Sequence, residues 1–231
     1  MPRISHLQLQ RRREDRVNVF FGGEFAFSLL LDLAVRLKVD QDISDAEIAA
    51  LQAEDSYRTG LDRALRWIAL RPRSRLDVER YLADKEVPPD VAPRVLARLT
   101  ELEYLDDRAF AQWWVDSRAA KRPRGRQVLR HELSAHGVAP EIIAAVTGDV
   151  DEPNAAVALA LTQARRYRTE DRATFNRRLG SYLSRRGFGY GAVREALSAA
   201  WQVVSTDRTA DDDQAADDGA FGELGFGDSD G

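Results

Sequence analysis

A pattern of about 50 residues that occurs three times is the feature that most constrains the fold. The segments align when Leu82, Leu133 and Leu183 are superposed, and they read ERYLADKEVPPDVA, RHELSAHGVAPEII and RRLGSYLSRRGFGYGAV. A single unit of this length buries little apolar surface, whereas stacked units cover one another. The sequence therefore predicts a mainly α-helical protein of three tandem three-helix repeats. We expect these repeats to form an elongated curved array with a continuous core.

Turn and capping residues divide each repeat into three helices. Ser74 with Asp77 three residues later is typical of a capping box, and Asp107 is placed to cap the fourth helix. The predicted helices cover residues 57–71, 74–85 and 89–103 in the first repeat, 107–120, 125–136 and 140–148 in the second, and 153–167, 172–186 and 191–204 in the third.

The second helix of each repeat is expected to end in one of two ways. Gly137 and Gly187 suit the left-handed backbone conformation that commonly ends a helix. The first repeat has Glu86 at the matching position, so we expect its helix to stop at Pro88 and Pro89 instead.

The N-terminal region has a different pattern. In RVNVFFGGEFAFSLL, apolar residues alternate on both sides of Gly22 and Gly23, which predicts a β-hairpin. Helical patterns follow over 29–38 and 45–55, with Ser44 as an N-cap. The predicted organisation is a flexible basic N-terminus over 1–15, the β-hairpin with helices over 16–56, helical repeats over 57–105, 106–150 and 151–206, and a disordered acidic tail over 207–231.

Charge is unevenly distributed along the chain. The formal net charge is -4, yet residues 207–231 hold nine acidic residues and one arginine. The preceding residues carry 33 basic against 29 acidic side chains, so this body is basic. Almost all of its cations are arginines, which bind phosphate and carboxylate groups well, although genome composition would give the same bias.

Other classes of protein are disfavoured by what the sequence lacks. There is no cysteine, and no apolar run reaches the roughly 18 residues of a membrane span. We therefore expect a cytoplasmic protein that does not enter a membrane. His131 and His136 lie on different faces of one helix, and no phosphate-binding loop motif is present. The sequence predicts no enzyme activity, no metal site and no cofactor.

Basic clusters recur near the second helix of each repeat and predict a stripe that contacts nucleic acid. The candidate residues are Arg71, Arg73 and Arg75 in the first cluster, Lys121, Arg122, Arg124, Arg126 and Arg130 in the second, and Arg177, Arg178, Arg185 and Arg186 in the third. The alternative is a solvated face whose arginines cover apolar neighbours and form pairs such as Arg75 with Glu79. Trp113 and Trp114 are expected to fill the core between repeats, with stacking on a base as the alternative.

Four motifs resemble the successive motifs of the RecX family of bacterial RecA regulators. They are RPRSRLDVERYL, LDDRAFAQWWVDSR, RGRQVLRHELSAHGV and RRLGSYLSRRGFGYGAVREAL, and the resemblance covers about residues 61–200. It implies a non-catalytic protein that binds the groove of the RecA filament on single-stranded DNA. It also implies lowered ATPase, strand-exchange and coprotease activities of RecA. Glu86 and the acidic tail depart from the family pattern.

The partners implied by this resemblance are the RecA filament and single-stranded DNA, with double-stranded DNA as a further ligand, and we expect a monomer. The basic clusters would then be the filament contacts. The alternative function is a stand-alone, non-specific DNA-binding protein built of small helical bundles. No helix groups asparagine, glutamine and arginine for base readout, which favours the filament regulator.

Overall fold

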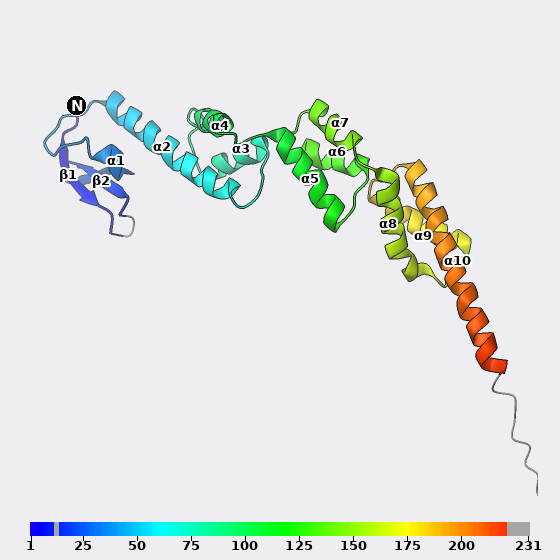
Figure 1. The fold of residues 1–231 in the computed structure, drawn as a ribbon. Coiled ribbons are helices and arrows are strands. Elements are labelled where there is room, and N and C mark those ends of the chain that lie inside the picture. Colours follow the sequence, from blue (N-terminus) through cyan, green and yellow to red (C-terminus); the bar gives the residue numbers. More distant parts are fainter. Residues whose placement is uncertain (12–13, 221–231) are drawn as a thin grey trace, which may run out of the picture. The chain divides into compact units, whose positions relative to one another are not determined.

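The computed structural model describes residues 1–11 and 14–220, with side chains through Asp207 in the last helix. This part of the chain is mainly helical and begins with a small sheet (Figure 1). It divides into two compact units, Met1–Phe110 and the residues from Ala111 onward.

The N-terminal sheet has three antiparallel strands in the order β1-β2-β3. They are β1 (Ile4–Leu9), β2 (Arg16–Phe21) and β3 (Glu24–Leu30). The predicted hairpin is β2 with β3, and Gly22 and Gly23 adopt positive φ angles of 55° and 87° between them. The expectation of a flexible N-terminus is wrong for β1, which pairs with β2 and buries Ile4 completely. The basic composition of this end gave no strand signal, although Ile4 and Leu7 of β1 pack against the apolar cluster of the sheet.

Two helices follow the sheet, and the second is longer than predicted. They are α1 (Leu31–Ala34) and α2 (Asp45–Ile68). Ser44 caps α2 with the expected geometry, and Glu47 completes a capping box. The predicted boundary between residues 56 and 57 is wrong, because α2 continues through it.

Helix α2 belongs to two hydrophobic clusters at once. Ile48 and Leu51 in its first half pack against the cluster of the sheet. Tyr57 and Leu61 in its second half pack against the cluster of the first repeat. The helix therefore joins the sheet to the first repeat without a linker.

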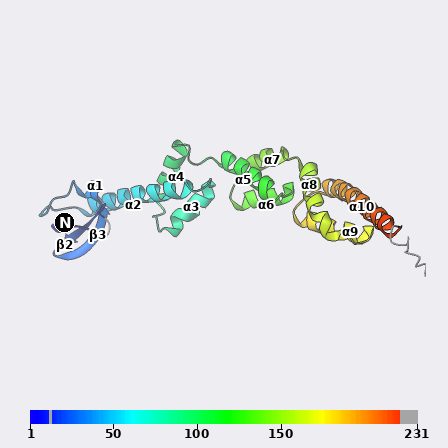
Figure 2. The same ribbon diagram turned by 60° about the horizontal axis from the view of Figure 1, so that its bottom comes forward.

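The remaining helices follow the predicted threefold pattern (Figure 2). They are α3 (Arg75–Asp84), α4 (Ala92–Glu101), α5 (Asp107–Lys121), α6 (Arg126–Ala135), α7 (Pro140–Gly148), α8 (Glu152–Ala164), the short 3-10 helix η1 (Arg165–Tyr167), α9 (Arg172–Arg185) and α10 (Tyr190–Ala220). In the described part of the chain, no helix is both long and apolar enough to cross a membrane.

The second helix of every repeat ends in the same way. Gly137 and Gly187 have φ angles of 74° and 84°, as predicted, and Glu86 has a φ of 57°. Past Glu86, the N–H of Val87 donates to the carbonyl of Leu82 at 3.0 Å, which is the Schellman arrangement. The expectation that the prolines would end this helix differently is wrong, since Glu86 adopts the glycine conformation.

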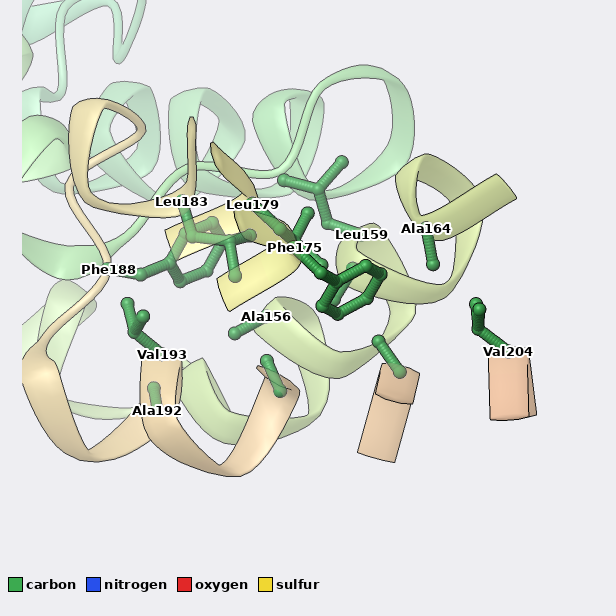
Figure 3. Close-up of a cluster of buried hydrophobic side chains, with 13 residues drawn as sticks. Ala156, Leu159, Ala164, Phe175, Leu179, Leu183, Phe188, Ala192, Val193 and Val204 are labelled. Carbon is green, nitrogen blue, oxygen red and sulfur yellow. The ribbon is translucent and has the colours of Figure 1, made fainter. Parts of the chain in front are cut away.

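The first and third repeats each have a hydrophobic cluster of their own. In the third repeat the cluster comes from α8, α9, α10 and Phe188 in the loop before α10 (Figure 3). Phe175, Leu179 and Leu183 of α9 are fully buried there. A separate cluster fills the first repeat. Each of these clusters lies within one unit, and the expected continuity of the core from repeat to repeat stays a prediction.

The predicted disorder from Asp207 is wrong as far as Ala220. Helix α10 is packed up to Val204 and continues to Ala220. Packing fixes the start of this helix, so its extension needs no new nucleus, and it continues through residues 207–220 although six of them are aspartates, which are weak helix formers. Residues 221–231, the rest of the predicted tail, lie outside the described part of the chain.

Candidate nucleic-acid interface

The first basic cluster builds a stack of cations and rings. The guanidinium of Arg73 lies 3.8 Å from the ring centre of Trp67, and the Trp67 and Tyr81 rings are stacked with centroids 4.4 Å apart. Lys85 lies over Tyr81 at 5.4 Å. Burial lowers the pKa of Arg73, and the positive charge of Arg71 lowers it further. Arg73 therefore supports the fold of the first repeat, while Arg71 is exposed.

Arg75 marks the start of α3 and receives a cap from the next repeat. Its backbone N–H donates to Oδ1 of Asp107 at 2.8 Å. The expected role of Asp107 as cap of α5 is wrong, because Asp106 accepts the N–H groups of Arg108 and Ala109 at that helix start. Asp107 is the first residue of α5, so it joins one repeat to the next through a charged hydrogen bond.

Two residues of the second cluster hold the end of α7. Nη2 of Arg126 donates to the carbonyl of Val150 at 2.7 Å, and Nε of Arg130 donates to Oγ1 of Thr147 at 3.1 Å. Positive groups at a helix C-terminus are stabilising because the carbonyls there carry negative partial charge. Both side chains therefore contribute to the fold of the second repeat, Arg126 from a half-buried position and Arg130 from an exposed one.

Arg124 belongs to a second internal network. Its Nε lies 4.0 Å from Oε1 of Glu132, whose other oxygen accepts hydrogen bonds from Trp114 at 2.8 Å and Arg118 at 3.0 Å. The Trp114 ring also lies 4.5 Å from the ring of His136. These contacts of Trp114 lie within its own repeat, and the expectation that the two tryptophans fill the core between repeats stays a prediction.

The third cluster is divided between paired and exposed side chains. Arg178 pairs with Glu170 at 2.5 Å, and the guanidinium of Arg186 lies 5.1 Å from the ring centre of Tyr182. Arg177 and Arg185 are exposed and form no ion pair within the described part of the chain. The same holds for Lys121 and Arg122 of the second cluster.

A backbone contact brings the second and third clusters together. The N–H of Gly125 donates to the carbonyl of Arg186 at 2.9 Å. A Cβ atom on Gly125 would lie 2.0 Å from the carbonyl oxygen of Gly187, so only glycine fits. This contact places the start of α6 against the end of α9.

Exposed cations surround that contact, and we call Lys121, Arg122 and Arg185 the joint surface. Lys121 and Arg185 are the last residues of α5 and α9. Exposed groups of this kind contact phosphate without reading base sequence. Among the described residues, no three histidine, aspartate or glutamate side chains gather in a way that could hold a metal ion.

Comparisons with known proteins agree with this architecture. Family models match the chain at residues 2–44 (Regulatory protein RecX N-terminal domain), 61–99 (RecX, first three-helix domain) and 106–146 (RecX, second three-helix domain). Regulatory protein RecX of Mycolicibacterium smegmatis is 36% identical over 168 residues, which cover 68% of this chain and 87% of that protein. The chain belongs to the RecX family. It is therefore a member of a family of regulatory proteins.

Further RecX proteins match over longer segments. Regulatory protein RecX of Bacillus subtilis is 29% identical over 202 residues, covering 85% of this chain and 76% of that protein. A crystal structure of regulatory protein RecX shares the fold with a TM-score of 0.63 and 22% identity, covering 84% of this chain and 98% of that one. RecX from Lactobacillus salivarius has a TM-score of 0.59 and 21% identity, covering 64% and 97%.

Proposed function

We propose that this protein is a negative regulator of RecA that binds the RecA filament on single-stranded DNA. Binding would lower the ATPase, strand-exchange and coprotease activities of the filament. Membership of the RecX family supports the regulatory role. The joint surface is the observation that supports a contact with the filament. A filament on DNA exposes phosphates. Exposed cations that form no ion pair within the described chain can bind these phosphates without breaking an existing contact.

The basic residues take two roles in this proposal. Lys121, Arg122 and Arg185 contact the filament, because their charges are not used within the described chain. Arg126 and Arg130 hold the end of α7, so they are poor probes of binding. Reversing their charge would place one carboxylate beside the carbonyl of Val150 and another beside the hydroxyl of Thr147, and so destabilise the second repeat near the end of α7.

Single-stranded-DNA-dependent ATP hydrolysis by RecA, measured with increasing amounts of this protein, tests the proposal. The wild-type protein is expected to inhibit hydrolysis. The double variant Arg122→Glu with Arg185→Glu should need at least about tenfold more protein for half-inhibition, since several phosphate contacts are lost or opposed. The matched control is Arg165→Glu with Arg166→Glu, which changes the same charge at exposed positions of η1.

Two outcomes would contradict the proposal. Absence of inhibition by the wild-type protein would remove the regulatory activity itself. Inhibition that disappears when DNA is added in excess, with no association of the protein with RecA in a pull-down, would support the stand-alone DNA-binding protein instead.

A further inference from the structure

A groove between α9 and α10 in the third repeat has the chemistry of a nucleotide site. Its volume is about 330 Å³, at the lower end of ligand pockets. Val193 and Leu197 of α10 line it with apolar surface. A Cβ atom on Gly180 of α9 would lie 3.4 Å from Cδ1 of Leu197, so the two helices pack closely there.

Polar groups and an aromatic ring complete the lining. Tyr190, the first residue of α10, is 83% exposed. Arg172 and Asn176 contribute from α9, one helical turn apart, while Arg194 contributes from α10. No acidic residue lines this groove among the residues described.

The charges of the two arginines are available to a ligand. Arg194 forms no ion pair within the described part of the chain. The guanidinium of Arg172 lies 5.9 Å from the ring centre of Trp201, at the outer limit of a cation–π contact. The nearby carboxylate of Asp171 is occupied as a helix cap, since it accepts the N–H groups of Ala173 and Thr174.

We propose that this groove holds one nucleotide of a single DNA strand, with the base stacked on Tyr190 and the phosphate bound by Arg172 and Arg194. Exposed aromatic rings beside cations are the usual means of holding unpaired bases without sequence preference. The span from residue 190 to residue 198 along α10 is about 12 Å, which accommodates a base and its phosphate together. The inference deepens the proposed function and rests on it for the source of the strand.

Stacking is tested with Tyr190→Ser in the full-length protein, by fluorescence anisotropy on oligothymidylate of about 12 nucleotides. Loss of one base stack should weaken binding roughly 5- to 150-fold. Tyr190→Phe should bind within about twofold of wild type, because phenylalanine keeps the ring. Tyr104→Ser is the matched control, since Tyr104 is also exposed but belongs to the other unit. An abasic strand of the same length should bind wild type and Tyr190→Ser equally.

The phosphate contact is tested with Arg172→Gln combined with Arg194→Gln. This variant should weaken the normal and the abasic strand alike and reduce the salt dependence of log K by about 2. Titration with thymidine monophosphate distinguishes the source of the ligand. Displacement of the oligonucleotide by the free nucleotide would mean that the groove accepts a nucleotide without the rest of the strand.

The outcomes separate this inference from the proposed function. Equal oligonucleotide affinity of wild type and Tyr190→Ser overturns the nucleotide site. If that variant binds DNA normally but no longer inhibits RecA, the groove meets an acidic protein surface, and only the proposed function survives. If Tyr190→Ser binds DNA weakly while the wild-type protein never inhibits RecA, the groove stands and the proposed function falls.

Discussion

Asp55 is a charged residue that is buried between α2 and the N-terminal sheet. It lies inside α2, at the end of the helical pattern predicted for 45–55, and is only 8% exposed. Its carboxylate accepts Nη2 of Arg16 at 2.8 Å and the N–H of Leu30 at 2.6 Å. The sequence shows the charge of Asp55 but not its partners, which come from strands 25 and 39 residues earlier.

Replacement of Asp55 by alanine should lower the free energy of unfolding by about 3–5 kcal/mol, because it leaves a buried guanidinium and a backbone N–H without their acceptor. Urea titration followed by circular dichroism measures the effect. Asp62→Ala is the control, since it removes an exposed pair with Arg66 and should cost less than about 1 kcal/mol. Equal losses in the two variants would contradict the anchoring role of Asp55.

The sequence predicted the candidate binding residues only as groups of basic side chains, without the role of each one. The sequence identified three basic clusters, but it could not distinguish Arg122, which is exposed, from Arg126, whose acceptor is a carbonyl 24 residues later. Tyr190 and Arg194 were missed, although both stand in the quoted motif GFGYGAVREAL. An exposed tyrosine four residues before an arginine on one helix was the available signal.

Helix ends were predictable where glycine marks them and not where another residue takes the same conformation. Gly137 and Gly187 predict the helix ends at which they adopt positive φ angles. Glu86 also adopts a positive φ, but a glutamate does not predict it. The reason is that the repeat demands one backbone geometry after Leu82, Leu133 and Leu183, whatever the side chain. A left-handed conformation costs a residue with a Cβ roughly 1 kcal/mol more than glycine.

The Glu86→Gly substitution should therefore raise the free energy of unfolding by about 1 kcal/mol. The reverse exchange, Gly137→Glu, places a side chain at a φ of 74° in the second repeat and should lower it by a similar amount. Urea titration measures both changes in the free energy of unfolding, from the shift of the midpoint at an unchanged m-value. A destabilised Glu86→Gly protein would show that the side chain of Glu86 supplies a contact that outweighs its backbone cost.

Acidic caps that reach from one helix to another were not predicted, because they depend on three-dimensional proximity. Oε1 of Glu152, at the start of α8, accepts the N–H groups of Arg126 at 2.9 Å and Gly189 at 3.3 Å. The starts of α6 and α8 and the loop before α10 therefore share one carboxylate. Asp107 serves Arg75 in the same way in the first repeat.

Glu152→Ala should destabilise the protein by about 0.5–2 kcal/mol, the usual range for loss of a helix cap. The matched control is Glu141→Ala, since Glu141 is exposed in the first turn of α7 and forms no such cap among the described residues. Amide hydrogen exchange should locate the effect at the first turn of α6. Unchanged exchange there would mean that water replaces the carboxylate without loss.

At the scale of the whole molecule, the sequence predicted the number and order of the helices well, because apolar periodicity over 50 residues is a strong signal. It did not predict that the first and third repeats would each have a hydrophobic cluster of their own. The acidic tail is the remaining large-scale feature, and its charge opposes that of the basic body. An acidic segment in the same chain repels the phosphates of a nucleic acid and so opposes their approach to the basic side chains.

Deletion of residues 207–231 should therefore raise the affinity for single-stranded DNA. The increase should be larger at about 50 mM than at about 200 mM salt, because salt ions screen the negative charge of the tail. The deletion leaves Val204, the last buried residue of α10, in place. A full-length variant with every tail aspartate and glutamate changed to the amide is the control, and it should behave like the deletion. Equal affinity of all three proteins at low salt would show that the tail does not oppose binding.

The contacts of Glu152 and Gly125 also affect the order in which the repeats can fold during synthesis. A ribosome releases the chain from its N-terminus at about 5–20 residues per second, and domains fold as they emerge. The carboxylate that caps α6 lies 26 residues downstream of Arg126, so the ribosome synthesises it about 1–5 s after the start of α6. Gly125 needs a carbonyl from the end of α9, which is made later still. The second repeat is thus completed only after most of the third has been synthesised, whereas the first repeat is complete once Asp107 has emerged.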